Sequence, residues 1–165
     1  MPNSQLKPLS MSEILQKTSE LKSKKEKLDF LRLHHSPQFH WLLNFAFHPG
    51  IIFELPETDP PYRPLQVEGE AFGMLYSLMP KMTLFVRGGY RGPLNQTTRE
   101  GIFIQTLEAL EPEDAKLLLS VKNKKIPYKG ITAKLIDEAY GSYDPKNPNI
   151  ICPCKQGGMK FTTNG

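Results

Sequence analysis

Residues 36–50, SPQFHWLLNFAFHPG, contain the clearest fold signal in the chain. Serine followed by proline is a common helix start, because serine caps the first turn and proline is tolerated at the first helical position. Apolar side chains then recur at helical spacing, and Pro49 and Gly50 stop the pattern. The segment predicts a helix, with these apolar positions: Phe39, Leu42, Leu43, Ala46 and Phe47.

Helix signals continue on both sides of this segment. Ser23 with Glu26 forms a capping-box pattern, Asn95 can cap a longer helix, and Pro112 can open the next one. Pro80 lies inside an apolar stretch and predicts a kink or a late start there. No stretch shows sustained strand alternation between hairpin turns. We therefore predict an all-α, compact multi-helix domain with six or seven helices, the others covering residues 12–21, 23–33, 75–86, 95–110, 112–121 and 131–140.

Prolines and glycines divide the chain into regions. Residues 49–73 contain five prolines and three glycines, which predicts one long Pro/Gly-rich loop. The expected organisation is a flexible N-terminus at 1–11, a helical domain at 12–143 and a flexible C-terminal tail at 144–165.

Composition limits the class of protein. The 165 residues carry 21 Lys plus Arg against 17 Asp plus Glu, a net charge of +4, and 39% are hydrophobic. Such a chain can bury a core, which argues against wholesale disorder, a collagen-like repeat or a coiled coil. No apolar run approaches the roughly 18 residues of a spanning helix, and residues 1–10 lack a signal-peptide layout. We expect a soluble, cytoplasmic protein with no membrane partner.

A metal site is the weakest functional hypothesis. A structural zinc site needs four ligands in paired spacings, and a Cys-x-Cys pair has no matching partner pair here. No phosphate-loop motif is present either. We expect no metal and no cofactor, and keep a small metal-binding protein as the third hypothesis, with candidate ligands His34, His35, His40, His48, Cys152 and Cys154.

Positive charge is concentrated late in the chain. Backbone amides near Gly130, at the start of the last predicted helix, would carry the positive end of the helix dipole, and lysines around them would form a phosphate clamp. A solvated basic loop is the alternative. The candidate DNA-binding residues are Lys122, Lys124, Lys125, Lys129, Gly130 and Lys134, with Arg87, Arg91 and Arg99 as a second set.

Residues 125–139, KIPYKGITAKLIDEA, resemble the end of the all-helical N-terminal DNA-binding domain of ATP-dependent DNA ligases. There, too, a short basic stretch leads to Gly-Ile or Gly-Leu and a final helix. The resemblance spans residues 22–143 and continues upstream in the same order, through residues 24–31, 36–47, 94–101 and 107–116. The Lys-x-Pro-Tyr-Lys-Gly pattern also resembles a small uncharacterised family of proteins from tailed phages, including cyanophages.

The ligase resemblance implies sequence-tolerant binding of duplex DNA through its backbone and minor groove. A ligase would continue with the adenylation motif Lys-x-Asp-Gly-x-Arg, but here Gly157 replaces Asp and Lys160 replaces Arg after Lys155. Either a decayed motif or coincidence explains this. Since the sequence ends five residues after Lys160, we expect no nucleotidyltransferase domain and no enzyme activity.

The leading hypothesis is therefore a non-catalytic, phage-encoded DNA-binding module located in the host cytoplasm. The alternative is a phage adaptor or inhibitor that binds host or viral replication or transcription machinery. Its contacts would be apolar residues of the Pro-rich loop: Phe53, Leu55, Tyr62 and Leu65.

Overall fold

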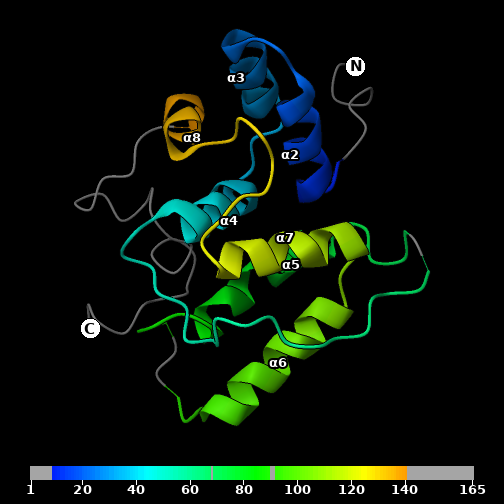
Figure 1. Cartoon of the computed structure of the whole chain (residues 1–165), viewed down its shortest axis with the longest axis vertical. Helices are drawn as coiled ribbons and strands as arrows, with labels where there is room; N and C mark the ends of the chain where they lie inside the picture. Colours follow the sequence, from blue (N-terminus) through cyan, green and yellow to red (C-terminus); the bar gives the residue numbers. More distant parts are fainter. Residues whose placement is uncertain (1–8, 68, 90–91, 141–165) are drawn as a thin grey trace.

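The computed structural model describes residues 9–67, 69–89 and 92–140 (Figure 1). Over these residues the chain is helical, with no strand beyond one isolated bridge, so the predicted all-α fold is confirmed. None of the described helices is both long and apolar enough to cross a membrane. The predicted C-terminal tail lies outside the described residues. The elements are α2 (Met11–Glu20), α3 (Lys24–Leu33), α4 (Pro37–Phe47), α5 (Met74–Leu78), the 3-10 helix η1 (Met79–Leu84), α6 (Gln96–Glu108), α7 (Pro112–Lys122) and α8 (Ala133–Tyr140).

The predicted helix starts are present. Ser23 Oγ accepts the Glu26 N–H at 3.1 Å, and Glu26 Oε1 accepts the Ser23 N–H at 3.2 Å, which completes the capping box of α3. Ser36 Oγ accepts the Phe39 N–H at 3.1 Å, and Asn95 Oδ1 accepts the Thr98 N–H at 2.8 Å. Caps depend on residues three apart, so the sequence alone is enough to locate them.

Two helices differ from their predicted extent. The segment predicted as one helix over 75–86 is split, because Pro80 has no N–H to donate to the preceding turn and the chain tightens into η1 after Leu78. The last helix begins at Ala133 rather than at 131. Gly130 has φ +81°, a conformation that no helix residue adopts, and Thr132 Oγ1 then accepts the Leu135 N–H at 3.1 Å.

The core is centred on α4, which contacts both α7 and α8. Four α4 side chains, those of Phe39, Leu42, Leu43 and Phe45, are fully buried. Each contributes roughly 1.5–3 kcal/mol of burial free energy, which is why this segment dominates the fold. The amphipathic faces of the surrounding helices close over it and join one continuous apolar cluster.

Side chains hold the long loop after α4 against the helices. Glu111 accepts the N–H groups of Gly69 and Ala71 at 2.8 and 2.7 Å, and Glu108 accepts the Arg63 N–H at 2.9 Å. The bridge between Phe53 and Val86 fixes the start of the loop. The glutamate contacts place the later part of the loop beside the end of α6 and the start of α7.

Candidate nucleic-acid interface

The structure separates the predicted basic residues into three places. In Figure 1, α3 and α8 lie at one end of the domain and the start of α6 lies at the other. Arg91 is outside the described residues. The three groups are Lys122, Lys124 and Lys125 at the end of α7, Arg87 and Arg99 beside the start of α6, and Lys129, Gly130 and Lys134 around the start of α8.

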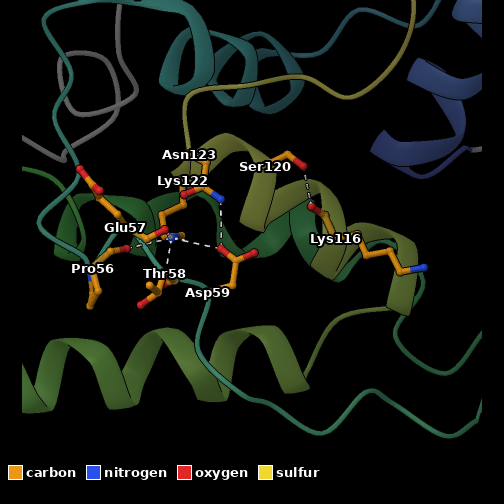
Figure 2. Close-up of polar contacts among 8 residues, drawn as sticks. All are labelled: Pro56, Glu57, Thr58, Asp59, Lys116, Ser120, Lys122 and Asn123. Carbon is orange, nitrogen blue, oxygen red and sulfur yellow. Dashed lines mark hydrogen bonds and ion pairs between the residues drawn. The ribbon is translucent and has the colours of Figure 1, made fainter.

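Lys122 is an internal anchor of the long loop. Its side chain is 2% exposed, and its Nζ donates to the carbonyl oxygens of Pro56, Glu57 and Thr58 at 2.9, 3.3 and 3.4 Å (Figure 2). Asp59 Oδ1 lies 3.3 Å from the same Nζ. While the loop is in this position a phosphate cannot reach Lys122, which differs from the exposed contact that the sequence suggested.

A hydrogen bond from a neighbouring amide completes this anchor. Asn123 Nδ2 donates to Asp59 Oδ1 at 3.0 Å, and Figure 2 shows the carboxylate between the amide and the ammonium. This bond and the ammonium of Lys122 lower the pKa of Asp59. A single lysine therefore donates to three consecutive carbonyls and also pairs with a carboxylate.

Lys124 is used in a similar way at the end of α4. It has φ +60°, and its Nζ donates to the carbonyl oxygens of Phe45 and His48 at 2.6 and 2.7 Å. Burial lowers its pKa to about 8. A cation at a helix C-terminus stabilises the helix dipole and occupies its terminal carbonyls. Lys125 is exposed and, of the three lysines at this end of α7, is the one whose side chain remains at the surface.

The two candidate arginines that the structure describes, Arg87 and Arg99, lie together and both bind protein groups. Arg87 Nε lies 2.7 Å from Glu54 Oε2, and Arg99 donates to the Leu84 carbonyl at 3.0 Å and to Gln96 Oε1 at 2.6 Å. Both line one open hollow of about 310 Å³ together with Glu54. Arg87 is thus paired with a carboxylate, whereas Arg99 donates to neutral acceptors.

The third group meets the beginning of α3 and forms a basic pocket. Here Lys134, Gly130 and Thr132 face Lys22, Lys24 and Lys27 across an open hollow of about 300 Å³, which we call the α3–α8 pocket. Its lining includes four lysines and a single carboxylate, that of Glu138.

Specific contacts bring the two walls of this pocket together. Lys24 Nζ lies 2.7 Å from Glu138 Oε2, and Lys27 Nζ donates to the Leu21 carbonyl. A Cβ at Gly130 would lie 3.1 Å from Lys27 Cε, so the glycine lets the α8 turn approach the lysine stem. Lys129, the residue before this turn, is exposed.

Helix dipoles make the α3–α8 pocket more positive. Lys24 is the first residue of α3, and Lys134 is the second residue of α8. The N-terminus of a helix carries a partial positive charge and favours acidic side chains, so lysines at two such ends oppose the usual preference. Glu26 is used in the α3 capping box, and the first turn of α8 has no acidic residue. An external anion would relieve this repulsion.

Comparison with protein-family models gives one match over most of the domain. The model described as a family of unknown function, DUF6433, matches residues 14–128. The chain belongs to this family. No curated protein and no solved structure matches the chain. The DUF6433 match includes the lysines on the α3 wall of the pocket and ends before Gly130 and α8.

The predicted binding set of this DUF6433 chain omitted the α3 wall of the pocket. Lys22, Lys24 and Lys27 belong to a lysine-rich run whose position in space is set by the packing of α3 against α8. The sequence did contain one signal for this wall, the several lysines at a predicted helix start. Lysines there are electrostatically unfavourable, which indicates a site for an external anion.

The predicted protein-binding and metal-binding residues also have defined positions. Phe53, Leu55 and Tyr62 of this DUF6433 member pack against the core. His35 and His40 lie 5.9 Å apart, measured between ring centroids, beside the Tyr140 ring. Among the residues that the structure describes, no three His, Cys, Asp or Glu side chains form a metal-binding group. Cys152 and Cys154 lie outside those residues.

Proposed function

We propose that the chain is a non-catalytic module that binds the backbone of duplex DNA through the α3–α8 pocket, with little sequence preference. The observation that carries the proposal is the collection of four lysines at the N-terminal ends of two helices, with a single glutamate among them. First-turn amides and lysines together form a favourable environment for a phosphate group.

The proposed contacts account for the expected lack of sequence preference. Phosphate contacts fix the position of a protein on DNA but carry no direct sequence information, and the pocket brings lysine side chains rather than groups that read base edges. The resemblance of residues 125–139 to ligase DNA-binding domains supports the same proposal. The exposed side chain of Lys129 extends the surface toward a neighbouring phosphate.

A salt titration tests this proposal. Binding of a fluorescein-labelled duplex would be followed by polarisation between about 50 and 200 mM NaCl, where phosphate-dominated affinity falls steeply. Each phosphate contact contributes about 0.9 to the slope of log affinity against log salt, so the double variant Lys22→Ala/Lys134→Ala should reduce that slope by about 1.8. A duplex of scrambled sequence should bind equally well.

The matched control removes two exposed lysines outside the pocket. Lys17→Ala/Lys81→Ala changes the net charge by the same amount, and both side chains are exposed. It should retain most of the affinity and of the salt slope. Equal losses in the two double variants would show that only net charge matters, and an affinity that does not fall with salt would reject phosphate binding altogether.

A further inference from the structure

A second surface of opposite charge lies between α2, the start of α7 and the end of the long loop. Two adjoining hollows of about 490 and 280 Å³ share Ser12, Glu13 and Glu113 in their linings and so form one continuous depression. We call it the α2–α7 groove, defined by Glu13, Gln16, Glu20, Leu65, Phe72 and Glu113. It shares no lining residue with the α3–α8 pocket.

One end of the groove is apolar and rigidly held. Phe72, which is 49% exposed, lines it, and Val67, in the same turn, is 57% exposed. Glu111 fixes this turn by accepting the N–H groups of Gly69 and Ala71. An exposed aromatic residue on a turn whose backbone is already fixed is typical of an interface anchor, because little backbone ordering entropy remains to be lost on binding.

The other end of the groove is acidic, although the chain as a whole carries +4. Glu13, Glu20 and Glu113 line it with a single lysine, Lys17. Glu13 and Glu20 are seven residues apart on α2, so they lie about 10 Å apart along the helix axis on one face. Carboxylates at this spacing match cations two turns apart on another helix.

A buried carboxylate lies next to this acidic end. Asp114 is 1% exposed, and its Oδ1 accepts the N–H of Ser12, which lines both hollows, at 3.2 Å. Its Oδ2 has no hydrogen-bond partner in the structure. Burial, with added repulsion from Glu111 and Glu13, raises the pKa of Asp114 although the Ser12 bond opposes the shift. A cation placed in the groove would reduce the repulsion among the carboxylates of Asp114, Glu111 and Glu13.

We propose that the α2–α7 groove binds a lysine- or arginine-bearing amphipathic helix of a partner protein. An apolar anchor of that helix packs on Phe72 and Leu65, and its cations pair with Glu13, Glu20 and Glu113. Helix-in-groove binding uses this combination of apolar anchors and flanking charges. Because the groove repels phosphate, this interaction is independent of the proposed DNA contact and can be tested separately.

A designed helix serves as the probe. A fluorescein-labelled peptide of about 18 residues, five helical turns of leucine and lysine in an amphipathic pattern, would be titrated with the full chain, beside a leucine–glutamate peptide of the same pattern. We expect the leucine–lysine peptide to bind and the leucine–glutamate peptide not to bind. Phe72→Ala should weaken binding about tenfold or more, as loss of a central aromatic anchor does. Glu13→Gln/Glu113→Gln should weaken it and reduce its salt dependence.

The controls alter similar side chains elsewhere. Leu33→Ala removes a side chain that is 56% exposed on α3, and Glu57→Gln removes a charge outside the groove, so neither should change binding. Glutamine at position 13 still serves a capping box, which protects the start of α2. In wild-type protein, peptide-induced amide shifts should centre on Glu13, Gly69 and Phe72, a result that requires no variant to fold.

Three outcomes would overturn the proposal. The leucine–lysine peptide could bind Phe72→Ala as tightly as wild type, or the amide shifts could map outside the groove. Sedimentation could instead show concentration-dependent self-association of the full chain that Phe72→Ala abolishes, which would make a second copy the occupant.

Discussion

Replacing Lys122 with methionine is expected to destabilise the domain by about 2–4 kcal/mol. The 2.9 Å bond to the Pro56 carbonyl is charge-assisted and contributes roughly 1.5–3 kcal/mol, and the contacts at 3.3 and 3.4 Å add less. Asp59 is 53% exposed, so its ion pair adds at most about 1 kcal/mol. Methionine preserves most of the apolar stem, so the loss of stability measures the contribution of the ammonium group itself.

Urea unfolding followed by circular dichroism measures this change. With a slope of roughly 2 kcal/mol per molar urea, the midpoint should fall by about 1–2 M. The thermal midpoint should fall by about 4–16 °C. Lys125→Met is the matched control, because the Lys125 side chain is exposed. Its free energy of unfolding should remain within about 0.5 kcal/mol of the wild-type value.

Two results would refute the reasoning about Lys122. If Lys122→Met unfolds within about 0.5 kcal/mol of wild type, water satisfies the loop carbonyls equally well and the anchor is not stabilising. If the folded variant loses duplex affinity with an intact circular dichroism spectrum, Lys122 contacts DNA and its burial does not describe the bound state.

Three further predictions concern a backbone turn and two titratable groups. In a urea titration, Gly130→Ala should lower the free energy of unfolding by about 1–2 kcal/mol, because Gly130 has φ +81° and lies close to the Lys27 stem. Gly101→Ala is the control: it lies at an open helical site of α6 and should raise the free energy of unfolding by about 0.5–1 kcal/mol. Burial and His35 lower the pKa of His40 to about 4 from an ordinary 6.5, so the stability that neutral His40 contributes should be complete above pH 6.5 and be lost as the pH falls toward 4. In His40→Gln, the midpoint of urea unfolding should depend less on pH over that range. The raised pKa of Asp114 means that its ionisation opposes folding, so the contribution of Asp114 to stability should fall as the pH rises above 3.8. Asp114→Asn, which still accepts the Ser12 N–H, should lack that loss and should unfold at higher urea than wild type near pH 7.

Local sequence was sufficient to predict the helices because their signals act over three or four residues. Ser23, Ser36 and Asn95 cap the helices that they were expected to cap, and Pro112 begins α7. The segment around Pro80 was harder, since a proline inside an apolar stretch fits either a kinked helix or a 3-10 turn. The structure has the 3-10 turn, in which Met79 and Met82 are buried in the core.

The candidate site was harder to predict because it depends on contacts across long sequence separations. Lys122 is more than sixty residues from the carbonyls it binds, and Lys24 is more than one hundred from Glu138. A run of lysines gives the same sequence signal whether its ammonium groups face solvent or buried carbonyls. Once the fold brings Pro56 and Phe45 beside the end of α7, desolvated carbonyls need donors and the two lysines provide them.

These assignments limit how tightly the α3–α8 pocket could hold DNA. Lys122 and Lys124 are used inside the protein, and Arg87 is paired with Glu54. In the pocket, Lys24 pairs with Glu138 and Lys27 donates to the Leu21 carbonyl, so Lys22 and Lys134, with the exposed Lys129 beside them, are the lysines best placed to contact phosphates. About three phosphate contacts correspond to a salt slope of roughly −2 to −3 and to dissociation constants in the range of about 10⁻⁴ to 10⁻⁶ M at physiological salt. Binding this weak becomes useful when a second interaction raises the effective concentration of the DNA. A partner that itself binds DNA and places its helix in the α2–α7 groove would provide that interaction. With such a partner present, Phe72→Ala should weaken DNA binding, whereas without it the variant should bind DNA as wild type does.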